Sequence, residues 1–218
     1  MAWNKDNVDL ICDIGEISGL FERSHSLDDF LSTAVSIIAF HMRAAVCSIY
    51  LYESDRKELI LAANQGLESA PRSVRLKYGE GITGLALKEM RPICEGHGSR
   101  NPNFKFIEGI QEEAYEAFLA VPILRGIHRV GVIVVQDPQP YYFDQNDIKA
   151  LRAISAQLAV TIENAKLLID LHGAQDEEGE EDEEGDEEGN GGGGGRRGWI
   201  ERWPSQVVLA VSQVYWTH

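Results

Sequence analysis

Histidine and cysteine are the side chains of this sequence best suited to catalysis or metal binding, so their spacing comes first. The three cysteines, Cys12, Cys47 and Cys94, lie far apart, without a Cys-x-x-Cys pair or a clustered histidine. The six histidines show no metal-ligand spacing, and none pairs visibly with a cysteine or serine nucleophile. The pattern therefore predicts no catalytic residue, no metal site, no cofactor and no disulfide framework, and it favours reduced, mostly buried thiols.

A glycine-rich turn at residues 79–84, with the sequence GEGITG, could bind phosphate, because free amides at a helix N-terminus attract anions. The turn lacks the Lys-Ser/Thr pair of a P-loop, and its Gly-x-Gly-x-x-Gly spacing does not occur within a βαβ unit. We therefore interpret it as a structural corner between a strand and a helix. Glycine relieves crowding at such a corner if the backbone angles are left-handed.

The charge of the chain is concentrated in one segment. The formal net charge is −15, and the eleven acidic residues between Asp176 and Glu188 contribute −11 of it, which leaves −4 for the remainder. Without a basic face, we expect no binding to nucleic acid or to anionic lipid. There is no run of about 18 to 20 apolar residues and no secretion signal, so we expect a soluble, cytoplasmic protein that does not enter a membrane.

The hydrophobic pattern predicts the helices and strands that would position these residues. Apolar residues at helical spacing predict helices at residues 7–21, 26–41 and 144–168, and a short helix at 82–90 follows the glycine-rich turn. Runs of β-branched and aromatic residues predict strands at 46–52, 58–63, 73–76, 117–124 and 130–136. Pro122 is expected at a sheet edge or a bulge, because it cannot donate a ladder hydrogen bond. This order predicts a mixed α/β (α+β) domain with one core.

Four segments, taken in order, resemble a GAF domain. They are GEGITG at 79–84, FLAVPI at 118–123, RVGVIVVQ at 129–136 and YFDQNDIKALRAISAQLAVTIENA at 142–165. The resemblance covers residues 4–171, and within the superfamily the chain is most similar to the N-terminal sensor domains of nitrogen-branch phosphotransferase enzymes I (phosphoenolpyruvate-protein phosphotransferases). It implies a central antiparallel sheet with the N- and C-terminal helices on one face, often a dimer interface, and a loop-covered pocket on the other.

The covering loop is the irregular stretch at residues 95–113, since loops this long inside a compact domain usually carry function. A pocket combines an apolar wall with a few polar groups. Our candidates for the wall are Phe104, Phe106, Tyr115 and Phe118, and those for polar anchors are Ser48, Glu95, Arg100 and Asn101. Alternatively, the aromatic residues only attach the loop to the sheet.

The resemblance implies a regulatory domain rather than an enzyme. The chain lacks the Gly-Gly-x-Thr-Ser-His stretch that carries the phosphorylated histidine of enzymes I, so phosphotransfer is expected only of a longer parent protein. Cys94 is followed by Glu95 instead of histidine, which argues against covalent bilin binding, and residues 103–106 have the wrong order for the cyclic-nucleotide signature. We expect a small intracellular ligand of the amino acid or 2-oxo acid class, a homodimer formed through the terminal helices, and signalling to an output domain.

The C-terminal part has a different character. Residues 1–172 are expected to form the sensor domain, and the acidic, glycine-rich residues 173–198 a flexible linker. Residues 199–218 are rich in tryptophan, and residues 197–218 resemble a short dynein heavy chain segment that contains no nucleotide-binding motif. Two alternatives to ligand sensing therefore remain: a dimerisation or interaction module without a ligand, and a carrier in an artificial fusion with a dynein fragment.

Overall fold

The computed structural model describes residues 27–67, 74–107 and 114–180. The helix expected at 7–21, the linker beyond Glu180 and the tryptophan-rich segment lie outside the described residues. The described elements up to Leu167 belong to one compact unit. Within the described part of the chain, no helix is both long and apolar enough to cross a membrane.

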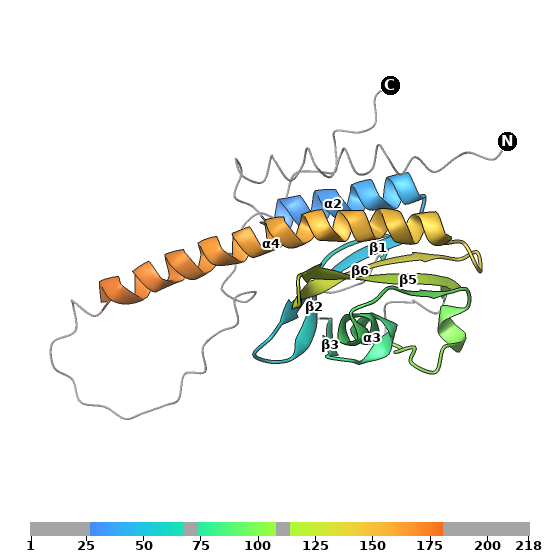
Figure 1. Ribbon diagram of the computed structural model, residues 1–218, viewed down its shortest axis with the longest axis horizontal. Helices are drawn as coiled ribbons and strands as arrows, with labels where there is room; N and C mark the ends of the chain where they lie inside the picture. Colours follow the sequence, from blue (N-terminus) through green and yellow to red (C-terminus); the bar gives the residue numbers. More distant parts are fainter. Residues whose placement is uncertain (1–26, 68–73, 108–113, 181–218) are drawn as a thin grey trace, which may run out of the picture. The chain divides into compact units, whose positions relative to one another are not determined.

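A six-stranded antiparallel sheet forms the centre of this unit, in the order β3-β2-β1-β6-β5-β4 (Figure 1). The strands are β1 (Val46–Glu53), β2 (Glu58–Gln65), β3 (Arg75–Lys77), β4 (Ile93–Glu95), β5 (Ala117–Arg125) and β6 (His128–Asp137). The central strands β1 and β6 are buried on both faces, which explains their continuous apolar sequence. The mixed α/β prediction is therefore confirmed. Strand β4 escaped prediction because three residues are too few to show a period.

Helix α2 (Leu27–Met42) and the part of helix α4 (Gln145–Glu180) up to Leu167 cover one face of the sheet (Figure 1). Helix α2 buries the stripe that the sequence predicts, which includes Phe30, Ala34 and Ile38. Helix α4 begins with a reciprocal cap, because Asp144 Oδ1 accepts the amide of Asp147 at 3.1 Å and Asp147 Oδ2 accepts the amide of Asp144 at 2.9 Å.

Helix α4 extends beyond its predicted end at residue 168. It continues to Glu180, across the expected domain boundary at residue 172 and into the first residues of the acidic segment. Glutamate has a high helix propensity, so Glu177 and Glu178 favour this continuation. The acidic composition alone therefore did not end the helix.

The opposite face of the sheet carries α3 (Gly81–Glu89), which contacts β5, β6 and β3 (Figure 1). The turn before α3 is the structural corner that the sequence predicts, since Gly79 has φ +82° and Gly81 has φ +70°. At Gly84 the requirement for glycine is steric instead, because a Cβ there would lie 2.9 Å from the carbonyl oxygen of Lys77. Tight packing of α3 on the corner thus requires these glycines.

Pro122 lies on β5 just beyond the reach of β4, whose pairing with β5 ends at Ala120. The register of β5 against β6 shifts between Ile123 and Leu124, immediately after the proline. The expected position at an edge or a bulge is confirmed, because none of the described strands pairs with the outer side of β5 at this point.

Candidate functional site

The candidate site lies on the α3 side of the sheet, beneath a segment that we call the strap, residues 93–107. The strap begins as β4, pairs with β5 from Ile93 to Glu95, and continues through a short 3-10 helix, η1 (Gly98–Arg100). His97 Nδ1 lies 2.5 Å from Glu116 Oε2, and the amide of Gly98 donates to the carbonyl oxygen of Glu116 at 2.7 Å. These contacts attach the first half of the strap to β5 and to Glu116, the residue before it.

The second half of the strap turns back over the corner before α3. Asn101 forms the turn, because its Oδ1 accepts the amide of Asn103 and its carbonyl oxygen accepts the amide of Phe104, both at 2.8 Å. Lys105 Nζ then reaches Glu80 Oε1 at 2.9 Å. A Cβ on Gly81 would lie 3.1 Å from Lys105 Cβ, so the strap rests directly on the corner.

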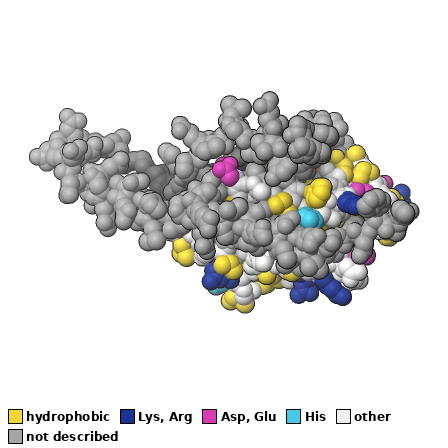
Figure 2. Space-filling view, turned by 90° about the horizontal axis from the view of Figure 1, so that it is seen from above, with side chains coloured by type: hydrophobic (Ala, Val, Ile, Leu, Met, Phe, Trp, Pro, Cys, Tyr) yellow, Lys and Arg dark blue, Asp and Glu magenta, His cyan; other side chains and the backbone are white. Residues whose placement is uncertain are grey.

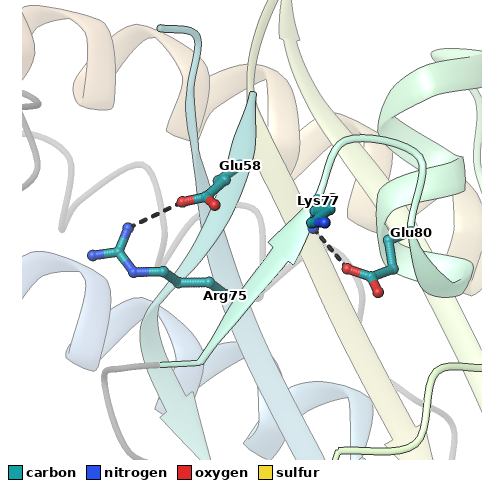
Figure 3. Close-up of polar contacts among 4 residues, drawn as sticks. All are labelled: Glu58, Arg75, Lys77 and Glu80. Carbon is teal, nitrogen blue, oxygen red and sulfur yellow. Dashed lines mark hydrogen bonds and ion pairs between the residues drawn. The ribbon is translucent and has the colours of Figure 1, made fainter. Parts of the chain in front are cut away.

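Glu80 serves both the corner and the strap. Its Oε2 accepts the backbone amide of Lys77 at 2.9 Å, as Figure 3 shows, while Oε1 pairs with Lys105. The hydrogen bond from the Lys77 amide, followed by the bond from Lys105, lowers the pKa of Glu80. The carboxylate therefore stays ionised near neutral pH and holds the strap by a charge-assisted contact.

Little space remains between the strap and the sheet. A cavity of about 10 Å³ is left, which is roughly what one water molecule needs. It is lined by Tyr50 and Phe118 from the sheet, Leu76 from β3, Gly81, Ile82 and Thr83 from α3, and Phe104, Lys105 and Ile107 from the strap. Because Phe104 and Ile107 also pack against the buried core of this face, they fill the place beneath the strap.

The sheet beneath the strap is not wholly apolar. Ser48 has only 1% of its surface exposed, and its Oγ has no hydrogen-bond partner among the described residues. Alternation along β1 places it on the same face as Val46 and Tyr50, which belong to the core beneath α3 and the strap. Gln136 of β6 is fully buried and lies opposite Val46 and Phe118. A buried hydroxyl without a partner is costly, which marks Ser48 as a position for a bound polar group.

The structure brings some of the predicted pocket residues together and separates others. Phe104 and Phe118 line the cavity, Tyr115 packs against the same core, and Ser48 lies in the sheet on this face. Phe106 does not form a wall, because 58% of its surface is exposed. Arg100 is also exposed, at the end of η1.

The two remaining polar candidates have local roles. Asn101 builds the turn described above, and Glu95 is half-buried, paired with Phe118 in the β4–β5 ladder. Sequence reasoning missed Ile107 and Gln136 among the residues of this region. Gln136 carried a usable signal, since it is a polar residue within an otherwise apolar strand.

The thiols of the described residues are not activated. Burial raises the pKa of Cys47 far above its usual value. Cys47 is buried as the sequence predicts, whereas Cys94 is exposed. Partial desolvation, with the nearby carboxylates of Glu95, Asp147 and Asp144, nevertheless raises the pKa of Cys94. Both thiols are therefore protonated at neutral pH, whereas a cysteine nucleophile needs a lowered pKa. The described residues contain no group of three or more His, Cys, Asp or Glu side chains that could hold a metal ion.

Comparison with known proteins shows the family to which this chain belongs. A family model described as GAF domain matches residues 24–163. A relative from Escherichia coli (strain K12), named phosphoenolpyruvate-dependent phosphotransferase system, is 34% identical over 142 residues, which are 65% of this chain and 19% of the relative. The chain thus spans about a fifth of the length of this curated relative.

Solved structures agree on the fold. The GAF domain from a phosphoenolpyruvate-protein phosphotransferase of Coxiella burnetii matches with a TM-score of 0.67 and 24% identity, over 74% of this chain and 97% of that one. A free methionine-R-sulfoxide reductase from Neisseria meningitidis, solved with its substrate, matches with a TM-score of 0.61 and 18% identity, over 71% and 89% of the two chains. The fold is therefore shared by phosphotransferase domains and by a reductase. The chain belongs to the GAF domain family, a regulatory fold for ligand binding and signalling, and it is similar to the GAF domains of phosphoenolpyruvate-protein phosphotransferases.

Proposed function

We propose that this chain is a non-catalytic regulatory domain that binds a small intracellular ligand of the amino acid or 2-oxo acid class between the strap and the sheet. Binding changes how the terminal helices relate to an output domain, for which a phosphotransferase parent is the first candidate. The observation that carries the proposal is the buried Ser48 Oγ, which has no hydrogen-bond partner among the described residues. A polar ligand group at this position would satisfy it.

The polar attachment of the strap to the corner supports the proposal, because this attachment can open at modest cost. Among the described residues it is one ion pair, in which the Lys105 side chain is 50% exposed and that of Glu80 is 30% exposed. Ion pairs of this exposure contribute little stability, about 1 kcal/mol or less. A ligand that enters here must in addition move Phe104 and Ile107 away from the core against which they pack.

Protonated thiols support the non-catalytic part of the proposal. A GAF domain that acts as a reductase through cysteine would need an activated thiolate, and neither Cys47 nor Cys94 is in a setting that lowers its pKa. Free thiols also suit a reducing compartment, so a cytoplasmic location belongs to the same proposal.

Titration calorimetry of the 218-residue chain tests the proposal. The panel contains amino acids, 2-oxo acids, cyclic AMP and cyclic GMP. We expect saturable heat with an amino acid or a 2-oxo acid, and Ser48→Ala should weaken that binding about tenfold, since a lost hydrogen bond of about 1.4 kcal/mol changes affinity by that factor. Ser54→Ala, in an exposed turn, is the matched control. A folded chain that binds nothing in the panel contradicts the proposal.

A second function, dimerisation, is favoured by apolar residues exposed on the two long helices. Phe40 on α2 is 77% exposed, and Val160 and Leu167 on α4 are 46% and 59% exposed. Figure 2 looks onto the side that carries these helices and shows hydrophobic side chains at the surface. We propose that a homodimer forms through this side, either together with ligand sensing or instead of it.

A further inference from the structure

A groove of about 270 Å³ lies at the outer edge of the sheet, beside the part of β5 that β4 does not reach. Three separate parts of the chain line it. They include Arg91 from the link between α3 and β4, Val121, Pro122 and Leu124 from β5, and Arg152 and Ala156 from α4. None of these residues lines the cavity beneath the strap, so the groove is a separate place on the described part of the molecule.

The backbone at this edge offers little to an added strand. The amide of Gly98 donates to the carbonyl oxygen of Glu116 at 2.7 Å, so the backbone of Glu116 faces the outer side of β5. Alternate residues along an antiparallel strand bond to the same neighbour, which directs the backbone of Pro122 outward as well. Proline has no amide to donate, and this weakens strand addition at the open edge. A partner must therefore be recognised mainly through the side chains of the groove.

Those side chains combine apolar surface with guanidinium groups. Val121 and Pro122 are buried and Leu124 is half-buried, whereas Arg91 and Arg152 are exposed. Arg91 pairs with Glu89, and Arg152 has no ion-pair partner among the described residues. A guanidinium binds a carboxylate through two parallel hydrogen bonds. The groove is therefore complementary to a partner that is both apolar and acidic.

We propose that this groove binds a segment of a partner protein in which an apolar side chain lies between carboxylates. The apolar side chain packs on Pro122 and Leu124, and the flanking carboxylates pair with Arg152 and Arg91. Burial of apolar surface supplies the affinity, while the charge pairs fix the position of the segment.

The acidic run of this chain does not fit the groove, because residues 176–188 contain no apolar side chain. The occupant is therefore a segment of a different polypeptide. The inference goes beyond ligand sensing and does not depend on it, since the groove and the cavity beneath the strap share no lining residue.

Fluorescence anisotropy of a labelled peptide, Glu-Glu-Leu-Glu-Glu, titrated with the full 218-residue chain, tests the proposal. We expect saturable binding, and Arg152→Ala should weaken it at least about tenfold, because arginine is enriched among the residues that dominate interfaces. Arg75→Ala is the matched control. It removes one arginine from β3, at the opposite edge of the sheet, and should bind the peptide like the unchanged chain.

A second pair of variants locates the peptide on the protein. Ala156 is exposed on α4 and lines the groove, so Ala156→Trp fills the groove without changing the core. We expect this variant to weaken peptide binding at least about tenfold. Ala153 is also exposed on α4 but does not line the groove, and Ala153→Trp should bind the peptide like the unchanged chain.

The control peptide Glu-Glu-Gly-Glu-Glu keeps the charge and removes the apolar side chain, so it should bind at least about tenfold more weakly. Equal binding of the two peptides overturns the proposal, because the groove would then attract only charge. The proposal is also overturned if the folded chain, checked by circular dichroism, does not bind the first peptide at millimolar concentration. Equal weakening by Ala153→Trp and Ala156→Trp likewise overturns it. Should Ala156→Trp not fold, Arg152→Ala and Arg75→Ala decide by the same criterion.

Discussion

Glu80 shows how one side chain connects separate parts of the site. It accepts the Lys77 amide in the corner and pairs with Lys105 in the strap (Figure 3). Because both contacts stabilise the ionised form, the pKa of Glu80 is lower in the folded chain than in the unfolded one. Its stabilising contribution is thus present above the unfolded pKa, about 4.3, and is lost as the pH falls through the folded value.

Glu80→Gln should therefore change the acid side of the stability profile. In urea unfolding between about pH 3 and pH 7, we expect the variant to be less stable than the unchanged chain at neutral pH and to lose less stability on acidification. Glu58→Gln is the control, since Glu58 makes a longer ion pair of 3.4 Å with Arg75 (Figure 3). If Glu80→Gln and the unchanged chain lose the same stability on acidification, the role assigned to Glu80 is wrong.

Ser48 permits a prediction in which stability and binding change in opposite directions. Ser48→Ala removes a buried hydroxyl that has no partner among the described residues. We expect the free energy of unfolding to stay the same or to rise by up to about 1 kcal/mol, while ligand binding weakens. Urea unfolding measures the first effect, and Ser54→Ala in the exposed turn gives the reference. A loss above about 1 kcal/mol would show that the hydroxyl is satisfied within the chain.

At the scale of elements, the side chain of Tyr142 connects the segment before the start of α4 with the C-terminal end of α2. The Tyr142 hydroxyl donates to the carbonyl oxygen of Arg43 at 3.0 Å and lies 3.4 Å from that of Met42. Burial, followed by the charges of Asp137 and Asp147, raises the pKa of Tyr142, so the donor proton is kept. This contact fixes the entry to α4 against the exit of α2, two segments about a hundred residues apart in sequence.

Tyr142→Phe keeps the ring and removes only this hydroxyl. We expect a loss of about 1 kcal/mol in the free energy of unfolding, because the freed carbonyl oxygens lose a donor. Tyr141→Phe is the matched control, since Tyr141 is 75% exposed and should change stability by less than about 0.5 kcal/mol. Equal effects of the two substitutions in urea unfolding would argue against a special role for the Tyr142 contact.

At the scale of the whole molecule, the question is whether the helical side associates. Val160 is 46% exposed on α4, and a carboxylate at this position would be buried without a partner in a dimer formed through this side. We expect sedimentation to show a concentration-dependent dimer for the unchanged chain and a monomer for Val160→Asp.

Ile127→Asp is the control for this experiment, because Ile127 is 78% exposed but lies in the turn between β5 and β6. It should sediment like the unchanged chain. If the unchanged chain stays monomeric throughout the micromolar range, the dimer proposal is wrong. If Ile127→Asp also dissociates the dimer, the interface does not lie on the helices.

The sequence by itself determined the local parts of this protein. Apolar spacing predicted α2 and the start of α4, β-branched runs predicted five of the six strands, and the glycines of GEGITG predicted the corner. These features depend on neighbours within a few residues, where sterics and periodicity act directly.

Only the tertiary structure decided what those parts form together. Phe104 and Phe106 belong to the same short segment, yet the strap's contacts with the corner turn the first toward the core and leave the second exposed. Ser48 and Gln136 share a face because β1 and β6 pair in one register, and β4 exists because β5 lies beside it. Each of these outcomes depends on residues far apart in the chain, whose contacts leave no pattern in the local sequence.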